Sequence, residues 1–294
     1  MEYDDTVRFG TMERKRGPGR KVSFGESGMS IKEFFGFGGY SRPAEGYMSW
    51  QHLTFVTSLI VIMFACAVLL GRKYKDRKDK GKVLIWAALL IDGFELFKIV
   101  MLSIRGADPW HFLYDLPLFL CSIQLITIPL AAFSKGRVKE SALDFVMIFG
   151  LLGAVMGTYF AGNNYGTYPV LSFDNVVSGI THCISGFSSL YIMFAGLASM
   201  KKRNIPITLG ILAGFCVAAY TANVLLDYNY MFLMAGHGTP YDILFDLVDG
   251  SPVWYPLGVV GLFVIYIVSY YQIYYTVGMR SGARFKEHVR TAKV

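Results

Sequence analysis

Residues 50–70 read WQHLTFVTSLIVIMFACAVLL, and residues 72–82 just after them read RKYKDRKDKGK. The first stretch holds no Asp, Glu, Lys or Arg, and it is long enough to cross the roughly 30 Å hydrocarbon core of a bilayer as a helix. The second stretch carries seven Lys and Arg residues. An apolar run of this length followed by a dense cationic loop is typical of an integral membrane protein.

The composition of the whole chain points the same way. Of its 294 residues 54% are hydrophobic and 17% charged, and the mean hydropathy is +0.43, whereas soluble domains carry about 25% charged residues. The net charge of +7 lies in short clusters between apolar runs. That layout is typical of membrane topology and not of a surface that binds nucleic acid. We therefore expect membrane lipids, and no nucleic acid, as partners.

Six further apolar runs follow the first one. Lys and Arg cluster after the first, third, fifth and seventh runs, while the loops between these hold one basic residue or none. The positive-inside rule places the clusters, and with them the C-terminus, in the cytoplasm, and the N-terminus outside. We predict an all-α membrane protein, a bundle of seven transmembrane helices in the cell membrane. Its spans are placed at residues 50–70, 83–104, 113–133, 141–161, 176–198, 207–226 and 253–277.

The spans divide the chain into three parts. Residues 1–46 are rich in Gly and charge, which predicts a flexible N-terminal arm. Within it Ser30 and Glu33 have the spacing of a capping box, which favours a short interfacial helix as the alternative. Residues 47–279 form the predicted membrane domain, and residues 280–294 form a basic cytoplasmic tail.

The second predicted span carries three ionisable residues, Asp92, Glu95 and Lys98, in the run IDGFELFKIV. An ionisable group inside a membrane is costly unless it is paired. On a helix this spacing makes Glu95 a neighbour of both other residues. The pattern indicates a buried ion pair that fixes helix packing or, alternatively, a relay for protons or substrate.

Three more spans carry polar residues near their predicted outer ends. In the third and sixth spans these lie within YDLPLFLCSIQL and NVLLDYNYMFL. In the fifth span Ser178, His182, Ser185 and Ser189 recur at helical spacing. At about 1.5 Å per helical residue, these residues reach a similar depth, so the sequence predicts a polar pocket in the outer half of the bundle. The residues are Asp115, Cys121, Gln124, His182, Asn223, Asp227, Asn229 and Tyr230.

The four cysteines all fall inside apolar runs, so we expect no disulfide framework. We expect neither a metal site nor a bound cofactor, and the sequence does not indicate an oligomeric state.

The segments LPLFLC, the fifth-span His, NYMFL and LFDLVDGSPVWY, in this order, resemble the YwaF-like bacterial membrane proteins, which are related to the eukaryotic transmembrane protein 164 family. The resemblance covers residues 48–277. It implies a thiol-dependent acyltransferase that moves fatty acyl chains between phospholipids. Phe119 stands where YwaF-like proteins usually have His. Aligned on Pro117, the eukaryotic Pro-Cys-His pattern places its Cys at Leu118, about one helical turn before Cys121.

Three hypotheses about function follow. In the first, Cys121 attacks a lipid ester, His182 acts as general base, and Asn229 or Gln124 orients the base or stabilises the oxyanion. In the second, the protein is a non-catalytic binding protein or transporter whose pocket takes a small polar solute. In the third, it is a structural membrane subunit. The candidate substrate-binding residues are Glu95, Lys98, Asp115, Gln124, Asn223, Asp227 and Tyr230, and the solute site of the second hypothesis combines Glu95, Lys98, His182 and Asp227.

Overall fold

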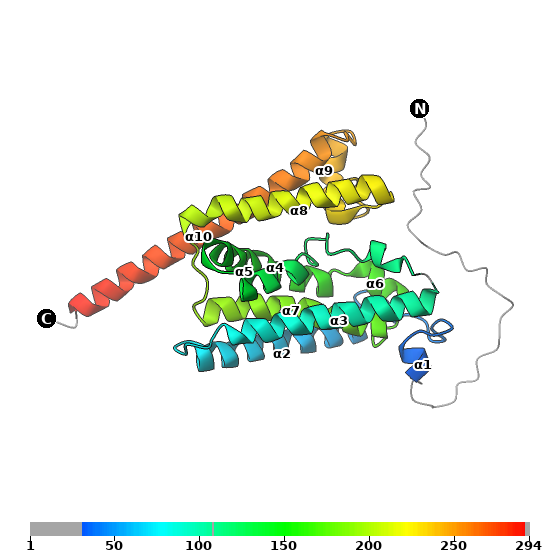
Figure 1. Cartoon of the computed structure of the whole chain (residues 1–294), viewed down its shortest axis with the longest axis horizontal. Helices are drawn as coiled ribbons and strands as arrows, with labels where there is room; N and C mark the ends of the chain where they lie inside the picture. Colours follow the sequence, from blue (N-terminus) through cyan, green and yellow to red (C-terminus); the bar gives the residue numbers. More distant parts are fainter. Residues whose placement is uncertain (1–30, 108, 292–294) are drawn as a thin grey trace. The chain divides into compact units, whose positions relative to one another are not determined.

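The computed structural model describes residues 31–107 and 109–291, and helices are the regular structure of these residues (Figure 1). The elements are α1 (Ile31–Phe34), α2 (Trp50–Tyr74), α3 (Lys82–Gly106), η1 (His111–Tyr114), α4 (Gln124–Phe133), α5 (Gly136–Tyr159), α6 (Gly162–Thr167), α7 (Phe173–Phe194), η2 (Lys202–Asn204), α8 (Ile205–Leu226), η3 (Tyr230–Phe232), α9 (Tyr241–Leu247) and α10 (Trp254–Thr291).

Five helical stretches of the described residues are long and apolar enough to cross a membrane: Trp50–Tyr74, Gly136–Thr167, Phe173–Phe194, Lys202–Leu226 and Trp254–Val277. They coincide with the first, fourth, fifth, sixth and seventh predicted spans. α3 occupies the second predicted span and is as long as α2, but it carries Asp92, Glu95 and Lys98 in its middle.

The third predicted span is not one continuous helix, and here the structure corrects the sequence prediction. Residues 115–123 form turns between η1 and α4, and α4 has 10 residues, or about 15 Å at 1.5 Å per residue. Pro117 disfavours a helical conformation at Leu116. The Ser122 hydroxyl lies 3.0 Å from the Phe119 amide nitrogen and 3.1 Å from the Phe119 carbonyl oxygen, so it takes the place of helical backbone bonds.

α5 and α7 form the most extensive helix pair, and α2, α3 and α4 pack around them (Figure 1). Small residues permit this close approach. A Cβ at Gly150 would lie 2.7 Å from the Ser185 carbonyl oxygen. The Ser185 and Ser189 hydroxyls donate to the Gly150 and Met147 carbonyls of α5 at 3.2 and 2.8 Å. These bonds hold α7 as a rigid wall beside α5.

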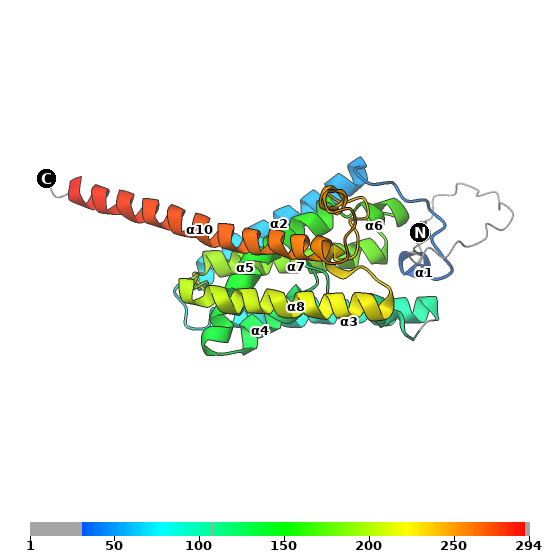
Figure 2. The same cartoon turned by 90° about the horizontal axis from the view of Figure 1, so that it is seen from above.

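On the other side of α5, α8 contacts α5, and α10 contacts both α8 and α9 (Figure 2). The buried carboxylate of Asp144 in α5 helps to hold this arrangement. It accepts hydrogen bonds from the backbone N–H groups of Ser199 and Met200 at 3.1 and 2.9 Å. It also accepts one at 3.0 Å from the Tyr271 hydroxyl of α10. One side chain thus connects α5, the α7–α8 connection and α10.

Residues 31–49, much of which the sequence assigns to a flexible arm, contact the ends of α3 and α7. Arg105 at the end of α3 makes two hydrogen bonds of 2.7 Å to Asp174 in the first turn of α7. The Tyr40 hydroxyl donates to the same carboxylate. Farther along, the Glu45 carboxylate accepts the Val170 amide at 2.7 Å. α1 is a single turn, and the expected arm over residues 1–30 lies outside the described residues.

Candidate functional site

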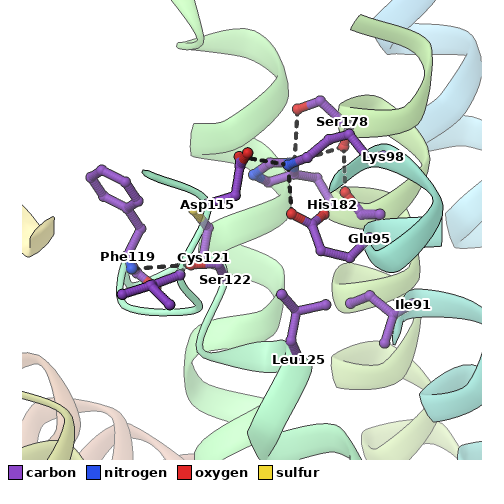
Figure 3. A pocket seen from close by; sticks show the side chains of 12 residues that line it. Ile91, Glu95, Lys98, Asp115, Phe119, Cys121, Ser122, Leu125, Ser178 and His182 are labelled. Atoms are coloured by element: carbon purple, nitrogen blue, oxygen red, sulfur yellow. Dashed lines mark hydrogen bonds and ion pairs between the residues drawn. The ribbon is translucent and has the colours of Figure 1, made fainter. Parts of the chain in front are cut away.

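A cavity of about 140 Å³ lies between the second half of α3, the 115–123 segment and α7 (Figure 3). It exists because α4 begins only at Gln124, so the irregular 115–123 segment, and not a continuation of α4, faces Lys98 in the second half of α3. The buried residues of α3 accordingly end at Ile91. The cavity is lined by Ile91, Glu95, Lys98, Asp115, Leu116, Phe119, Cys121, Ser122, Leu125, Ser178, Thr181 and His182.

The side chains of Cys121 and His182 lie beside each other in this cavity, close enough to interact electrostatically (Figure 3). The other ring nitrogen, Nδ1 of His182, lies 2.7 Å from the carbonyl oxygen of Ser178, one turn earlier on α7. A carbonyl oxygen only accepts, so Nδ1 carries the hydrogen and Nε2 is left as the acceptor for the thiol proton. This tautomer is the one that a general base for Cys121 requires.

The position of the His182 ring depends on a glycine of the neighbouring helix. Gly157 of α5 faces the imidazole, and a Cβ at Gly157 would collide with ring atoms Cδ2 and Nε2. Gly153, one turn earlier, faces the backbone of Cys121, where a Cβ would make an ordinary contact at 3.4 Å. α5 therefore forms the back wall of both reacting groups.

The segment that carries Cys121 also places backbone groups close to its sulfur. The N–H groups of Cys121 and Ser122 lie beside the thiol sulfur, where they favour a negative charge. α4 begins three residues later, at Gln124, and the N-terminal end of a helix favours a negative charge. A thiolate at this position would thus be stabilised by a cationic partner on one side and by backbone donors on the other.

An ion cluster occupies the other side of the cavity (Figure 3). Lys98 Nζ lies 2.5 Å from Glu95 Oε1 on the same helix and 3.3 Å from Asp115 Oδ1. The second Asp115 oxygen lies 3.3 Å from His111 Nε2. The pairing of Glu95 with Lys98 follows from their spacing, whereas the approach of Asp115 depends on the irregular 115–123 segment.

The lining of the cavity is divided by polarity. Lys98, Asp115 and Ser178 gather at one end, Ile91 and Leu125 lie at the other, and Cys121 with His182 stands between them (Figure 3). The cavity thus offers a polar region, a nucleophile with a base, and an apolar region in that order.

A family model described as the TMEM164 family matches residues 47–274. The chain belongs to the TMEM164 family. A search of curated proteins and a search of solved structures each gave no match.

Five of the candidate residues proposed from the sequence line the cavity of this TMEM164-family chain, and the rest do not. Gln124 is fully buried at the start of α4, where its Oε1 accepts from the Thr127 hydroxyl at 3.1 Å. Asp227 is an exposed residue at the end of α8. Asn229 uses its amide group to bind Met234 N and Ala235 O in its own loop, at 2.9 and 2.8 Å. The five that line the cavity are Glu95, Lys98, Asp115, Cys121 and His182.

Asn223 and Tyr230 bind each other and stand behind the 115–123 segment, so neither lines the cavity. The depth estimate failed for these residues because it treated every span as a straight helix. Sequence reasoning also missed Ser122, Ile91 and Leu125 as lining residues. Their position depends on where α4 begins, and a single sequence gives only Pro117 as a signal for that break.

Proposed function

We propose that this membrane protein is an acyltransferase that moves fatty acyl chains between phospholipids through a thioester on Cys121. The observation that carries the proposal is that Cys121 and His182 lie beside each other in a cavity that is polar at one end and apolar at the other (Figure 3). The family relationship supports it, because the thiol-dependent activity associated with eukaryotic relatives requires a nucleophile and a base in contact.

The reaction would proceed in two balanced halves. His182 Nε2 takes the thiol proton while the Cys121 sulfur attacks the carbonyl carbon of a phospholipid ester. The C–O bond breaks, and the leaving lysophospholipid oxygen takes the proton from His182. In the second half a lysophospholipid hydroxyl gives its proton to His182 and attacks the thioester carbon. The C–S bond breaks, and the proton returns to the sulfur.

The oxyanion of each tetrahedral intermediate needs hydrogen-bond donors. The backbone N–H groups of Cys121 and Ser122 take this role in the proposal, because they lie beside the sulfur in the turn that carries it. Asn229 and Gln124, the donors considered from the sequence, have no part in it. Neither lines the cavity.

The size of the cavity bears on how a lipid would bind. At about 10–15 Å³ per enclosed water, a cavity of 140 Å³ holds on the order of ten water-sized groups. This is room for an ester and its neighbours, but not for a whole phospholipid. In the proposal the head group faces Lys98 and Asp115, the ester faces Cys121, and the acyl chain passes Ile91 and Leu125 and remains mostly in the bilayer.

We further infer a multi-pass topology in the cell membrane with seven crossings. The count takes α3 as the second crossing and η1, the 115–123 segment and α4 together as the third. Irregular backbone at membrane depth is tolerated where it lines a cavity or is covered by protein. The alternation of basic loops supports an external N-terminus and a cytoplasmic C-terminus, which would open the cavity toward the outer leaflet.

The test is to trap the thioester. Purified full-length protein in lipid nanodiscs is incubated with a phospholipid that carries a labelled acyl chain, quenched in acid and digested. Mass spectrometry then locates the acyl group. We expect a hydroxylamine-sensitive adduct on Cys121 and labelled acyl transfer to added lysophospholipid. Both are lost in Cys121→Ala and retained in Cys183→Ala, which removes the neighbouring thiol of α7. Absence of the adduct, with lipid turnover equal in Cys121→Ala and wild type, would refute acyl transfer.

One observation favours a second candidate, a non-catalytic binding site for a small polar solute. The cluster of Glu95, Lys98 and Asp115 lines the same cavity and could recognise such a ligand without any chemistry. This alternative predicts a ligand-dependent rise in melting temperature that disappears in Lys98→Met and persists in Cys121→Ala. Acyl transfer predicts that the Cys121 adduct is still formed, more slowly, in Lys98→Met.

A further inference from the structure

The segment that carries Cys121 needs support from outside itself. Residues 115–123 make few backbone hydrogen bonds of their own, among them Leu118 N to Leu116 O at 2.7 Å and Ile123 N to Phe119 O at 2.9 Å. No helix fixes the direction of the Cys121 side chain in the way that α7 fixes His182. The contact between sulfur and imidazole therefore depends on what packs behind the segment.

Tyr230, from the loop after α8, packs there. It is fully buried, and its ring centroid lies 5.1 Å from that of Phe119, two residues before Cys121. Its hydroxyl donates to the carbonyl oxygen of Leu113, in η1 just before the segment. Tyr230 thus contacts η1 just before the segment and Phe119 in its middle, and these contacts limit how the turn that presents Cys121 can move.

Tyr230 is itself held by Asn223, the buried residue one turn before the end of α8. Asn223 Nδ2 donates to the Tyr230 carbonyl at 3.0 Å, and Asn223 Oδ1 accepts the Tyr230 amide at 2.5 Å. Both polar atoms of the Asn223 side chain are thus bonded to the backbone of one residue. Substitution of either residue removes part of a single rigid connection between α8 and the 115–123 segment.

The backbone around Tyr230 is in a conformation that side chains rarely adopt. Met231 and Phe232 have φ of 56° and 57°, in the left-handed region that is uncommon for residues other than glycine. Such conformations persist when the surroundings over-determine them, and they gather at functional sites. Here they turn the Phe232 ring back toward Phe119, to a centroid distance of 6.2 Å.

From these contacts we propose that Asn223 and Tyr230 are positioning residues that hold the Cys121 segment so that the thiol meets His182. The connection runs from α8 through Asn223 and Tyr230 to Leu113 and Phe119. Neither residue touches the lipid, because neither lines the cavity. This inference rests on the proposed function for its purpose, but its direct consequence, the reactivity of the Cys121 thiol, is measured without any lipid substrate.

The test measures the rate at which N-ethylmaleimide labels Cys121 in the full-length protein, located by mass spectrometry and followed across pH. Tyr230→Phe keeps the ring and removes the hydroxyl that binds Leu113. We expect labelling at neutral pH to slow about fivefold, the factor that one hydrogen bond is typically worth. The pH profile should move toward that of His182→Gln. Tyr266→Phe is the matched control, because it removes a 3.1 Å hydroxyl bond to the Ile148 carbonyl elsewhere, and it should label as wild type does.

A double substitution separates positioning from general loosening. If Tyr230 acts by holding Cys121 against His182, Tyr230→Phe has almost no further effect on labelling in a His182→Gln background. An equal slowing in both backgrounds, or a wild-type rate in folded Tyr230→Phe, would overturn the inference. Asn223→Ala should act in the same direction, and if it does not fold, Tyr230→Phe alone decides. If the variants label more slowly as expected but the wild-type protein forms no acyl adduct on Cys121, the proposed function is refuted and the positioning role still stands.

Discussion

α7 and the 115–123 segment each contribute one half of the Cys121–His182 pair, and they hold it by opposite means. α7 is a regular helix of 22 residues whose own backbone, at the Ser178 carbonyl, fixes the imidazole. The 115–123 segment is not a regular helix and takes its order from Ser122 and from the loop after α8. The position of the base, His182, is therefore determined by the local structure of a helix, whereas the position of the nucleophile, Cys121, is determined by contacts with residues distant in the sequence.

The difference teaches where each half is vulnerable. A change on α7 matters when it touches His182 directly or fills the space of its ring, because the helix is otherwise supported along its length by α5 and α2. A change near Cys121 matters even without touching the sulfur, because few bonds hold the turn. Both halves meet against α5, where Gly153 and Gly157 face them.

The largest effect is expected for His182→Gln, which removes the base from the α7 wall. Acyl transfer should slow on the order of 10²–10⁴-fold, the usual contribution of a general base. Transfer of a labelled acyl chain between phospholipids in nanodiscs measures it. Cys183→Ala, at the next residue of the same helix, is the control and should retain activity. Near-normal transfer by His182→Gln would remove the imidazole from the mechanism.

The second-largest effect is expected when the space around the His182 ring is filled. Gly157→Ala places a methyl group in the volume of the imidazole ring, and the ring must shift away from Cys121. A displacement of about 1 Å at a reacting group can cost on the order of 10²-fold in rate. Gly153→Ala adds the same methyl group one turn away, where it makes an ordinary contact, and should keep most of the activity. Equal activities of the two variants would contradict this reading of α5.

A smaller effect, on stability, is expected where α7 begins. Arg105→Met leaves the Asp174 carboxylate, 10% exposed, without its ion-pair partner. We expect a loss of about 2 kcal/mol in the free energy of unfolding, below the 3–5 kcal/mol of a fully buried pair. Thermal unfolding in detergent measures it. Arg77→Met breaks a pair in which Arg77 is 52% exposed, so its melting temperature should not change.

The smallest effect should appear on the side of the nucleophile. Ser122→Ala removes the hydroxyl that binds both backbone groups of Phe119, and acyl transfer should fall about fivefold, as for the loss of one hydrogen bond. Ser188→Ala on α7 removes a 2.8 Å bond to the Ile184 carbonyl. The backbone hydrogen bonds of a regular helix hold it without that side-chain bond, so the rate of acyl transfer by this variant should equal that of the wild type. If both variants behave alike, the proposed contrast between helix and turn is wrong.

The sequence predicted the helical membrane class, five of the spans and five residues that line the cavity. It did so because apolar length, basic loops and i, i+3 spacing are local properties that a helix preserves. Glu95 and Lys98 pair as their spacing predicts. Asn229 and Asp227 were misplaced because the chain bends after α8, at Asp227 and again at Met231, through left-handed backbone. That conformation has no reliable signal in residues other than glycine.

By itself, then, the sequence determined that the chain is a helical membrane protein with polar groups where lipid should be. Hydropathy and charge are summed over residues that are neighbours in the sequence, so they can be calculated without knowing the fold. Only the tertiary structure decided that Cys121 meets His182, that Gly157 makes room for the ring, and that Tyr230 supports the turn that carries the thiol. These contacts join residues dozens of positions apart through a break in the third predicted span, and side-chain packing across helices, not local propensity, determines such contacts.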